Sequence, residues 1–186
     1  MALRVQSGAA KGKRLKAPRN IALRPTSSRV KGALFNILAV EGIDGARVLE
    51  LFAGTGAMGI EALSLGASHV DFVERDPRTC HQLRENLVTA GLMDRATVHK
   101  SSAARALATL SGPFDLVLMD PPYADDSAAD LLDHLASPKL LAEAGLIVLE
   151  HATRSGPAEA PPCLQLSDTR RYGDTALSFY RRSGAA

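Results

Sequence analysis

The stretch FDLVLMDPPYADD, residues 114–126, joins an apolar run to a group of hydrogen-bond acceptors. The residues there that could do chemistry are Asp120, Pro121, Pro122 and Tyr123. Because proline lacks an N–H, this turn offers carboxylate and carbonyl oxygens without a competing donor. Such acceptors can hold both hydrogens of an amino group on a nucleobase, and Tyr123 can stack on the base. The tetrapeptide predicts group transfer to an amine nitrogen that Asp120 orients; a simple proline-rich turn is the alternative.

A glycine-rich loop follows the first predicted strand. In ELFAGTGAMGIEAL, residues 50–63, Gly54, Gly56 and Gly59 satisfy G-x-G-x-x-G between a strand and a helix. Glu74 lies 20 residues beyond Gly54, at the end of the next predicted strand, where a carboxylate can accept both hydroxyls of a ribose. This spacing predicts a nucleoside-containing cofactor, the alternative being a tight turn beside a solvated acid. The residues expected to contact the cofactor are Ala53, Gly54, Thr55, Gly56, Glu74 and Arg75.

An acid inside the first strand discriminates between cofactors. Glu50 stands four residues before Gly54, where a carboxylate can hold a cationic group such as an amino-acid ammonium. S-adenosylmethionine carries that group and NAD does not. A chain of 186 residues also leaves little room for a separate substrate domain of an NAD enzyme. S-adenosylmethionine is therefore favoured, although Glu50 could instead be an acid that faces outward at the end of the sheet.

Basic residues are concentrated near the N-terminus. The net charge is +2, but residues 1–40 hold nine Lys or Arg and no acid, which leaves 13 basic and 20 acidic side chains in the rest. A basic segment joined to an acidic body is typical of polyanion binding, because neutralising phosphates releases counterions. The four cations expected to meet nucleic acid are Lys11, Lys13, Arg14 and Lys16. The alternative is a solvated, poorly ordered tail.

Composition limits the class of protein. With 46% hydrophobic residues, the chain can bury the core of one main domain. Its cysteines, Cys80 and Cys163, show no C-x-x-C spacing, and its five histidines are scattered, so neither a disulfide framework nor a metal site is predicted. No apolar run approaches the roughly 18 residues that span a bilayer. We expect a soluble, cytoplasmic protein with no membrane partner.

Strand and helix signals alternate along the chain. Apolar runs predict strands at 47–52, 69–74, 96–99, 114–120 and 145–150. Helices are predicted at 27–39, 57–65, 77–90, 102–110 and 127–135. Two later strands, 163–172 and 175–181, flank Gly173-Asp174 as an antiparallel hairpin. The pattern predicts an α/β fold: a Rossmann-like, doubly wound, seven-stranded and mostly parallel sheet, whose carboxyl ends share one edge.

The motifs together resemble a known family. DPPY, ELFAGTGAMGIEALSLGA and FVERD are similar to those of class I S-adenosylmethionine-dependent amino-methyltransferases. RVQSGAAKGKRLKAP, LRPTSSRVKGALFNIL and RYGDTAL narrow the resemblance to the bacterial 16S rRNA guanine-N2 methyltransferase family, the RsmD type, from Arg4 to about Tyr180. The resemblance implies that the substrate is one guanine of 16S rRNA, in the small ribosomal subunit or a late precursor, and that the chain acts as a monomer.

The resemblance also assigns roles to residues. It makes Gly54 to Gly56 the cofactor loop, Glu74 the ribose ligand and Asp120 to Tyr123 the catalytic tetrapeptide. Substrate contacts nearer the reaction centre would come from Arg24, Thr26, Arg29 and Lys31. We expect two parts: a basic N-terminal extension, residues 1–26, which docks RNA as a β-hairpin, and a methyltransferase domain, residues 27–186.

Two positions depart from the family pattern. Gly32 stands where many relatives carry an acid, which removes a carboxylate and weakens the start of a helix. After the third strand the chain reads KSSAA where related enzymes often place an Asp for the adenine amino group, so Ser101 or Ser102 would have to substitute.

The residues alone leave other functions open. The same acceptors could serve DNA adenine or cytosine, or a protein glutamine amide. A non-catalytic RNA-binding module with a cofactor-like fold is a further alternative, against which the intact Gly54, Glu74 and Asp120 argue.

Overall fold

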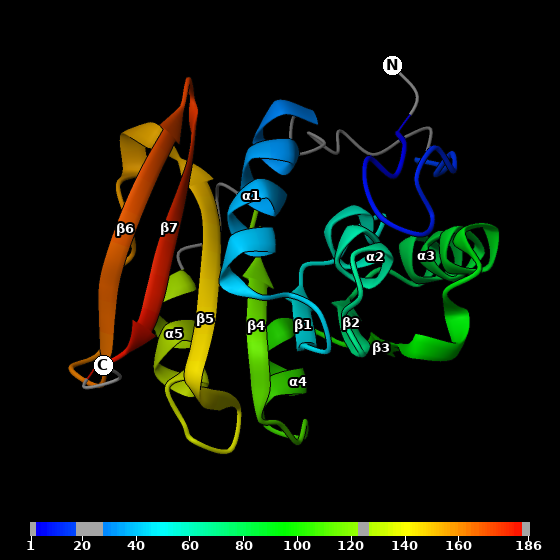
Figure 1. Cartoon of the computed structure of the whole chain (residues 1–186). Helices are drawn as coiled ribbons and strands as arrows, with labels where there is room; N and C mark the ends of the chain where they lie inside the picture. Colours follow the sequence, from blue (N-terminus) through cyan, green and yellow to red (C-terminus); the bar gives the residue numbers. More distant parts are fainter. Residues whose placement is uncertain (1–2, 18–27, 123–126, 184–186) are drawn as a thin grey trace.

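Figure 1 shows the computed structural model, a mixed β-sheet with helices on both faces. It describes residues 3–17, 28–122 and 127–183. Within these residues the seven-stranded sheet has the order β3-β2-β1-β4-β5-β7-β6. Its strands are β1 Arg47–Leu51, β2 His69–Glu74, β3 Ala96–Lys100, β4 Phe114–Met119, β5 Leu141–Ala152, β6 Leu164–Tyr172 and β7 Thr175–Arg182. The strands β1 to β5 pair in parallel and β7 pairs antiparallel with β5 and β6, which confirms the predicted fold class.

Helices cover both faces of the sheet (Figure 1). They are α1 Ser28–Glu41, α2 Ala57–Ser64, α3 Pro77–Ala90, α4 Ala103–Leu107 and α5 Ala128–Leu135, with 3-10 turns η1 Met93–Arg95 and η2 Thr153–Ser155. On one face Leu34 of α1 and Leu87 of α3 belong to the same apolar core, and on the other face Leu107 of α4 packs with Leu131 of α5. None of the described helices is long and apolar enough to cross a membrane.

Local signals set some element boundaries and pairing sets others. The helix α3 has the predicted ends, because the Asp76 carboxylate accepts from a first-turn N–H and Gly91 adopts a left-handed φ of 74°. The strand β5 begins earlier than residue 145, because Leu141 already pairs with Phe114 of β4 across an irregularity in register. That extension depends on the neighbouring strand and not on the residues of β5 alone.

The N-terminal residues 3–17, here called the arm, pack into the body of the protein. Val5, Ala10 and Leu15 are buried in the core that α1, α2 and α3 share. One antiparallel bridge joins Arg4 to Arg14. Figure 1 shows the arm lying over α2 and α3. This part of the predicted extension is therefore no solvated tail, and its residues 18–26 lie outside the described ones.

Two polar residues of α2 fix the backbone of the arm. The Glu61 carboxylate accepts from Gln6 N at 2.9 Å and from Ser7 N at 2.6 Å. Gly8 has a φ of 73°, and a Cβ added there would lie 1.8 Å from the carbonyl oxygen of Ser64. Only glycine allows so close an approach in this conformation.

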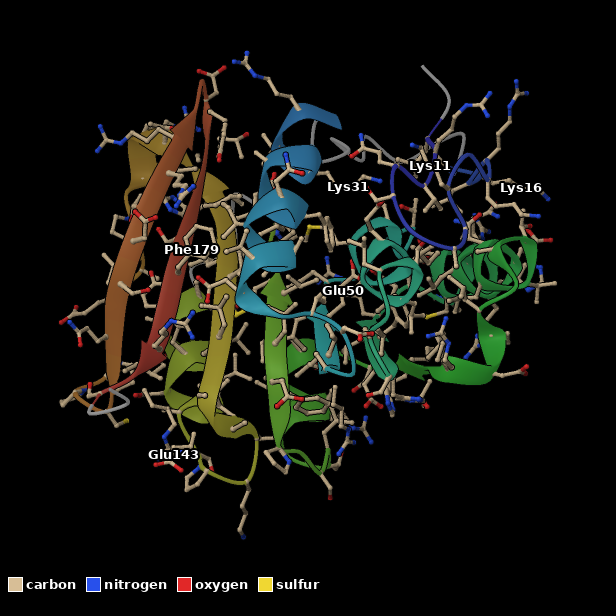
Figure 2. The ribbon with its side chains drawn as sticks, viewed as in Figure 1. Lys11, Lys16, Lys31, Glu50, Glu143 and Phe179 are labelled. Carbon is tan, nitrogen blue, oxygen red and sulfur yellow. The ribbon has the colours of Figure 1, made fainter. Side chains whose placement is uncertain are left out.

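A buried ion pair joins α1, α2 and the arm. Lys31 Nζ lies 2.8 Å from Glu61 Oε2 and donates to the Arg4 carbonyl at 3.0 Å. The two charged side chains are 3% and 1% exposed, and Figure 2 shows Lys31 between α1 and the arm. The sequence predicts a substrate contact at Lys31, but a buried, paired ammonium cannot reach a phosphate. We therefore assign Lys31 a structural role. Gly32 beside it faces the arm, since a Cβ there would lie 3.5 Å from Gln6 Oε1.

Removing the buried cation should destabilise the protein. Lys31→Ala leaves the Glu61 carboxylate buried without its counter-charge, a change that costs about 3–5 kcal/mol. Lys16→Ala is the matched control, because Lys16 Nζ lies 3.5 Å from Glu85 in an exposed pair. Exposed pairs of this kind contribute about 0.2–1 kcal/mol. Urea unfolding of the wild type and both variants measures the difference, and equal losses in the two variants would contradict the role of Lys31.

Candidate active site

The pleat of the sheet brings three carboxylates to one face of its carboxyl edge. Glu50 of β1 pairs in register with Phe72 of β2 and with Leu118 of β4. Residues in register share a face of a parallel sheet, and so do residues two apart along a strand. Glu74 follows Phe72 by two residues and Asp120 follows Leu118 by two. The three acids, predicted from separate motifs, therefore converge.

The side chain of Glu50 reaches the N-terminal turn of α2. Its Oε2 atom accepts from Gly59 N at 2.9 Å, and the residue is 3% exposed. Burial raises the pKa of Glu50 to about 8 against the opposing Gly59 hydrogen bond, and the negative charges of Asp120 and Glu74 raise it further. Free N–H groups at a helix N-terminus ordinarily bind anions. Here a carboxylate of the same chain takes that place, so the turn is unsuited to the pyrophosphate of a dinucleotide.

The glycine loop permits this arrangement. Gly56 is the N-cap of α2 with a φ of 73°, and a Cβ there would lie 2.0 Å from Leu83 Cδ1. A Cβ at Gly59 would lie 2.5 Å from Glu50 Oε2. Phe52, just before the loop, is the one described non-glycine residue with a positive φ, 59°. A bulky residue in that conformation is strained, a feature that clusters at ligand sites.

The Glu74 carboxylate is tied to the glycine loop. Its Oε2 atom accepts from Gly54 N at 3.0 Å, and its Oε1 atom accepts from Asp76 N at 2.8 Å. Two donors fix the orientation of the carboxylate, while each oxygen retains a further acceptor site. Glu74 is partly exposed and Arg75 is exposed. The carboxylate can therefore still accept from ribose hydroxyls, the role that the sequence predicts for it.

The structure distinguishes the two serine candidates. Ser102 is the N-cap of α4, where its Oγ accepts from Arg105 N at 3.4 Å. Ser101 N donates to the Glu74 carbonyl at 3.0 Å, which places Ser101 directly beside the predicted ribose ligand. Ser101 is the better placed of the two for an adenine contact, which stays a prediction.

The predicted catalytic tetrapeptide begins directly after β4, which ends level with β1. Asp120 is partly buried, Pro121 is buried and Pro122 is exposed, so the turn runs from the interior to the surface. Tyr123 lies outside the described residues. Within the described ranges, no group of three or more His, Cys, Asp or Glu is placed to hold a metal ion.

The predicted substrate cations occupy different environments. Exposed side chains of the arm are Lys11, Lys13, Arg14 and Lys16. Figure 2 shows Lys11 and Lys16 at the outer edge of the molecule. Arg29 is exposed in the first turn of α1. Arg24 and Thr26 lie outside the described residues, and Lys31 is buried.

Sequence reasoning missed Asn86 of α3, which is 1% exposed. Its Oδ1 atom accepts from Lys16 N at 2.8 Å, and its Nδ2 atom donates to the carbonyls of Lys16 and Thr55, both at 3.0 Å. One side chain therefore links the arm to the glycine loop. The sequence did hold a signal, because Asn86 lies three residues after Leu83 and four before Ala90 on the apolar face of α3. A polar group buried on such a face needs partners.

Comparison with known proteins establishes the family. The family model described as Conserved hypothetical protein 95 matches residues 3–181. The chain belongs to this family. The match confirms the RsmD-type methyltransferase family predicted from the motifs.

The relatives cover nearly the whole chain. It is 37% identical over 185 residues to the "Putative rRNA methyltransferase YlbH" of Bacillus subtilis, spanning 98% of this chain and 100% of that protein. It is 35% identical over 182 residues to the "Ribosomal RNA small subunit methyltransferase D" of Escherichia coli, spanning 97% and 90%. The solved structure of yhhF from Escherichia coli superposes with a TM-score of 0.88 at 31% identity, covering 98% of both chains.

The buried Glu50 should make stability depend on pH. Its pKa in the folded protein, about 8, lies above the 4.5 of an ordinary glutamate, so the folded state holds a proton that the unfolded chain releases. This stabilisation is complete below the unfolded pKa and is lost as the pH rises through the folded one. Glu50→Gln cannot titrate, so its unfolding free energy should fall less over that window. Chemical denaturation across the window tests this, and parallel profiles would mean that Glu50 is already ionised.

Proposed function

We propose that this protein transfers a methyl group from S-adenosylmethionine to the exocyclic N2 amino group of one guanine in the 16S rRNA of the small ribosomal subunit. The observation that carries the proposal is the convergence of Glu50, Glu74 and Asp120 at the carboxyl edge of the sheet. The names of the relatives from Bacillus subtilis and Escherichia coli support ribosomal RNA as the substrate. With this substrate, the proposal includes a cytoplasmic location for the enzyme.

The residues present fit this cofactor. S-adenosylmethionine carries a sulfonium and an ammonium and no phosphate, so the carboxylates of Glu74 and Asp120 attract it and repel a dinucleotide. Glu50 adds a third negative charge once it releases its proton. Glu50 would pair with the ammonium, Glu74 would accept from the ribose, and Ser101 would meet the adenine. When bound, the cofactor supplies an electrophilic methyl group.

Asp120 and the two prolines orient the accepting amine. The Asp120 carboxylate accepts one amino hydrogen, and a carbonyl of the proline turn accepts the other, because the prolines present no competing N–H. Holding both hydrogens directs the lone pair of the nitrogen out of the plane of the base. As positive charge grows on that nitrogen, the carboxylate stabilises it and then takes the proton. Tyr123 would stack on the flipped base.

The exposed arm cations would bind the RNA around this base. Lys11, Lys13, Arg14 and Lys16 project from a segment that Glu61 holds on α2. The chain is proposed to act on the small subunit or a late precursor as a monomer. The same set of acceptors would also fit an amine of DNA adenine or cytosine, or a glutamine amide. An experiment on the substrate must therefore distinguish these amines.

The substrate is tested by supplying labelled S-adenosylmethionine with separated ribosomal subunits, free 16S rRNA and duplex DNA. The proposal expects label on N2 of a single guanine of 16S rRNA, located by mass spectrometry of nuclease fragments. Label in DNA or in protein, or label on another RNA atom, would overturn the assignment of the substrate.

Asp120→Ala should lower the rate of methyl transfer by at least about 10²-fold, because orientation and electrostatics act on the transition state. Asp130→Ala is the control, since Asp130 is an exposed acid on α5. Single-turnover rates at saturating RNA measure the effect, and calorimetry verifies that the Asp120 variant still binds the cofactor. A rate close to that of the control would remove Asp120 from the mechanism.

Neutralising the arm should weaken the salt dependence of RNA binding. The four arm cations Lys11, Lys13, Arg14 and Lys16 are changed to Ala together. If all four contact phosphates, the magnitude of the slope of log K against log[salt] should fall by about 3, at about 0.7 per contact with a single strand. Cofactor affinity should not change, because Asn86 holds Lys16 through backbone atoms alone. Binding of 16S rRNA across a salt series provides the slopes, and equal slopes would mean that these charges are merely solvated.

A further inference from the structure

Apart from the arm, two further cations lie at the end of the β6–β7 hairpin. Arg154 belongs to η2 and Arg171 to β6, and both are exposed. Within the described residues neither guanidinium has an ion pair, whereas Arg170, the residue before Arg171 in β6, is paired with Asp168 at 2.8 Å. Arg154 and Arg171 are therefore free to meet an external anion.

Backbone contacts hold these two arginines at one end of the hairpin. Thr153 N donates to the Asp174 carbonyl at 2.9 Å, and Thr153 Oγ1 donates to the Gly173 carbonyl at 2.8 Å. These bonds tie η2 to the turn between β6 and β7. Arg154 follows Thr153 directly, and Arg171 lies just before the turn. We call residues 153–154 and 171–174 the tip.

The tip lies at the same edge of the sheet as the proposed active site. Met119 of β4 pairs with Leu149 of β5, so Asp120 is level with Glu150 and η2 lies beyond that level. The strand β5 is the neighbour of β4, about 5 Å away, whereas β6 lies three strands from β4, or about 14 Å. Figure 1 shows the tip and the arm at one edge of the molecule, on opposite sides of α1.

We infer that the tip is a second RNA-binding surface, where Arg154 and Arg171 bind phosphates on the side of the target base away from the arm. The inference rests on the proposed rRNA methyltransferase function. Outside residues 1–40 the chain has 20 acidic and 13 basic residues, so this part of the protein is negatively charged overall. The two arginines of the tip are therefore positive charges on a body that is otherwise acidic. Guanidinium groups bind phosphate oxygens in a bidentate manner.

The flipping of a base explains why two surfaces are needed. Extrusion of a base costs a few kcal/mol of stacking and pairing. Contacts on one flank alone would allow the RNA to rotate or slide as the base leaves its neighbours. The arm and the tip together hold the backbone on both flanks, so the displaced base can remain at the carboxyl edge near Asp120.

The test compares two double variants that lose equal charge. Arg154→Ala with Arg171→Ala removes the cations of the tip. Lys139→Ala with Arg182→Ala is the control, because Lys139 precedes β5 and Arg182 ends β7 at the opposite edge of the sheet. Binding of a 16S rRNA transcript and of small ribosomal subunits is measured across a salt series. The tip variant should lose about 1.4 units of slope in log K against log[salt], at about 0.7 per contact, and the control should lose none.

A second variant distinguishes the loss of charge from an effect of the substitutions on the fold. Arg154→Lys with Arg171→Lys keeps both charges, so it should retain the wild-type slope while binding more weakly, because lysine lacks the bidentate fork. Parallel slopes for the wild type and the alanine variant of the tip, in a wild type that binds and methylates rRNA, would overturn the second surface alone. An equal loss in the opposite-edge control would also overturn it. A wild type that neither binds nor methylates rRNA would overturn the proposed function and, with it, this inference.

Discussion

The hydrogen bond between the Glu50 carboxylate and Gly59 N, at 2.9 Å, is the contact on which the rest of the site depends. It requires glycine at position 59, since a Cβ there would lie 2.5 Å from the carboxylate oxygen. It also brings an acid to a helix N-terminus, where related nucleotide-binding folds offer N–H groups to phosphate. Burial then keeps the pKa of Glu50 near 8. The site can thus hold a proton until a cation replaces it.

The arm is built on the same helices as the glycine loop. Glu61, two residues after Gly59 on α2, accepts from the backbone of the arm and pairs with Lys31. Asn86 of α3 joins Lys16 to Thr55 with three hydrogen bonds. The surface proposed to meet RNA and the loop proposed to meet the cofactor are therefore fixed to one another through two buried polar residues, and their relative position is set before either ligand binds.

Some of this arrangement could be predicted from the sequence because it depends on local rules. Alternation of strands and helices gives the parallel sheet, and strand ends in such a sheet share an edge, which brings Glu74 and Asp120 together. The caps of α3 follow from Asp76 and Gly91. The hairpin around Gly173 follows from its turn residues.

Other features depend on partners far apart in the chain, and no periodic pattern encodes them. The partner of Lys31 is 30 residues away and that of Asn86 at Lys16 is 70 residues away. The family resemblance consequently assigns Lys31 to the substrate together with Arg29 of the same helix, although its ammonium is buried. An acid at Glu61 within the apolar run of α2 was the available signal, since a buried carboxylate needs a counter-charge. The length of β5 likewise follows from its pairing with β4.

We propose that Glu50 is protonated in the free protein and becomes the counter-ion of the cofactor ammonium. Calorimetric titration with S-adenosylmethionine near neutral pH, in buffers of different ionisation enthalpy, measures the protons released on binding. With a pKa of about 8 Glu50 holds its proton under these conditions, and an adjacent cation lowers that pKa. The wild type should therefore release about one proton more than Glu50→Gln, the number that a single titrating carboxyl supplies. Equal proton release by the two proteins, with the cofactor bound to both, would contradict it.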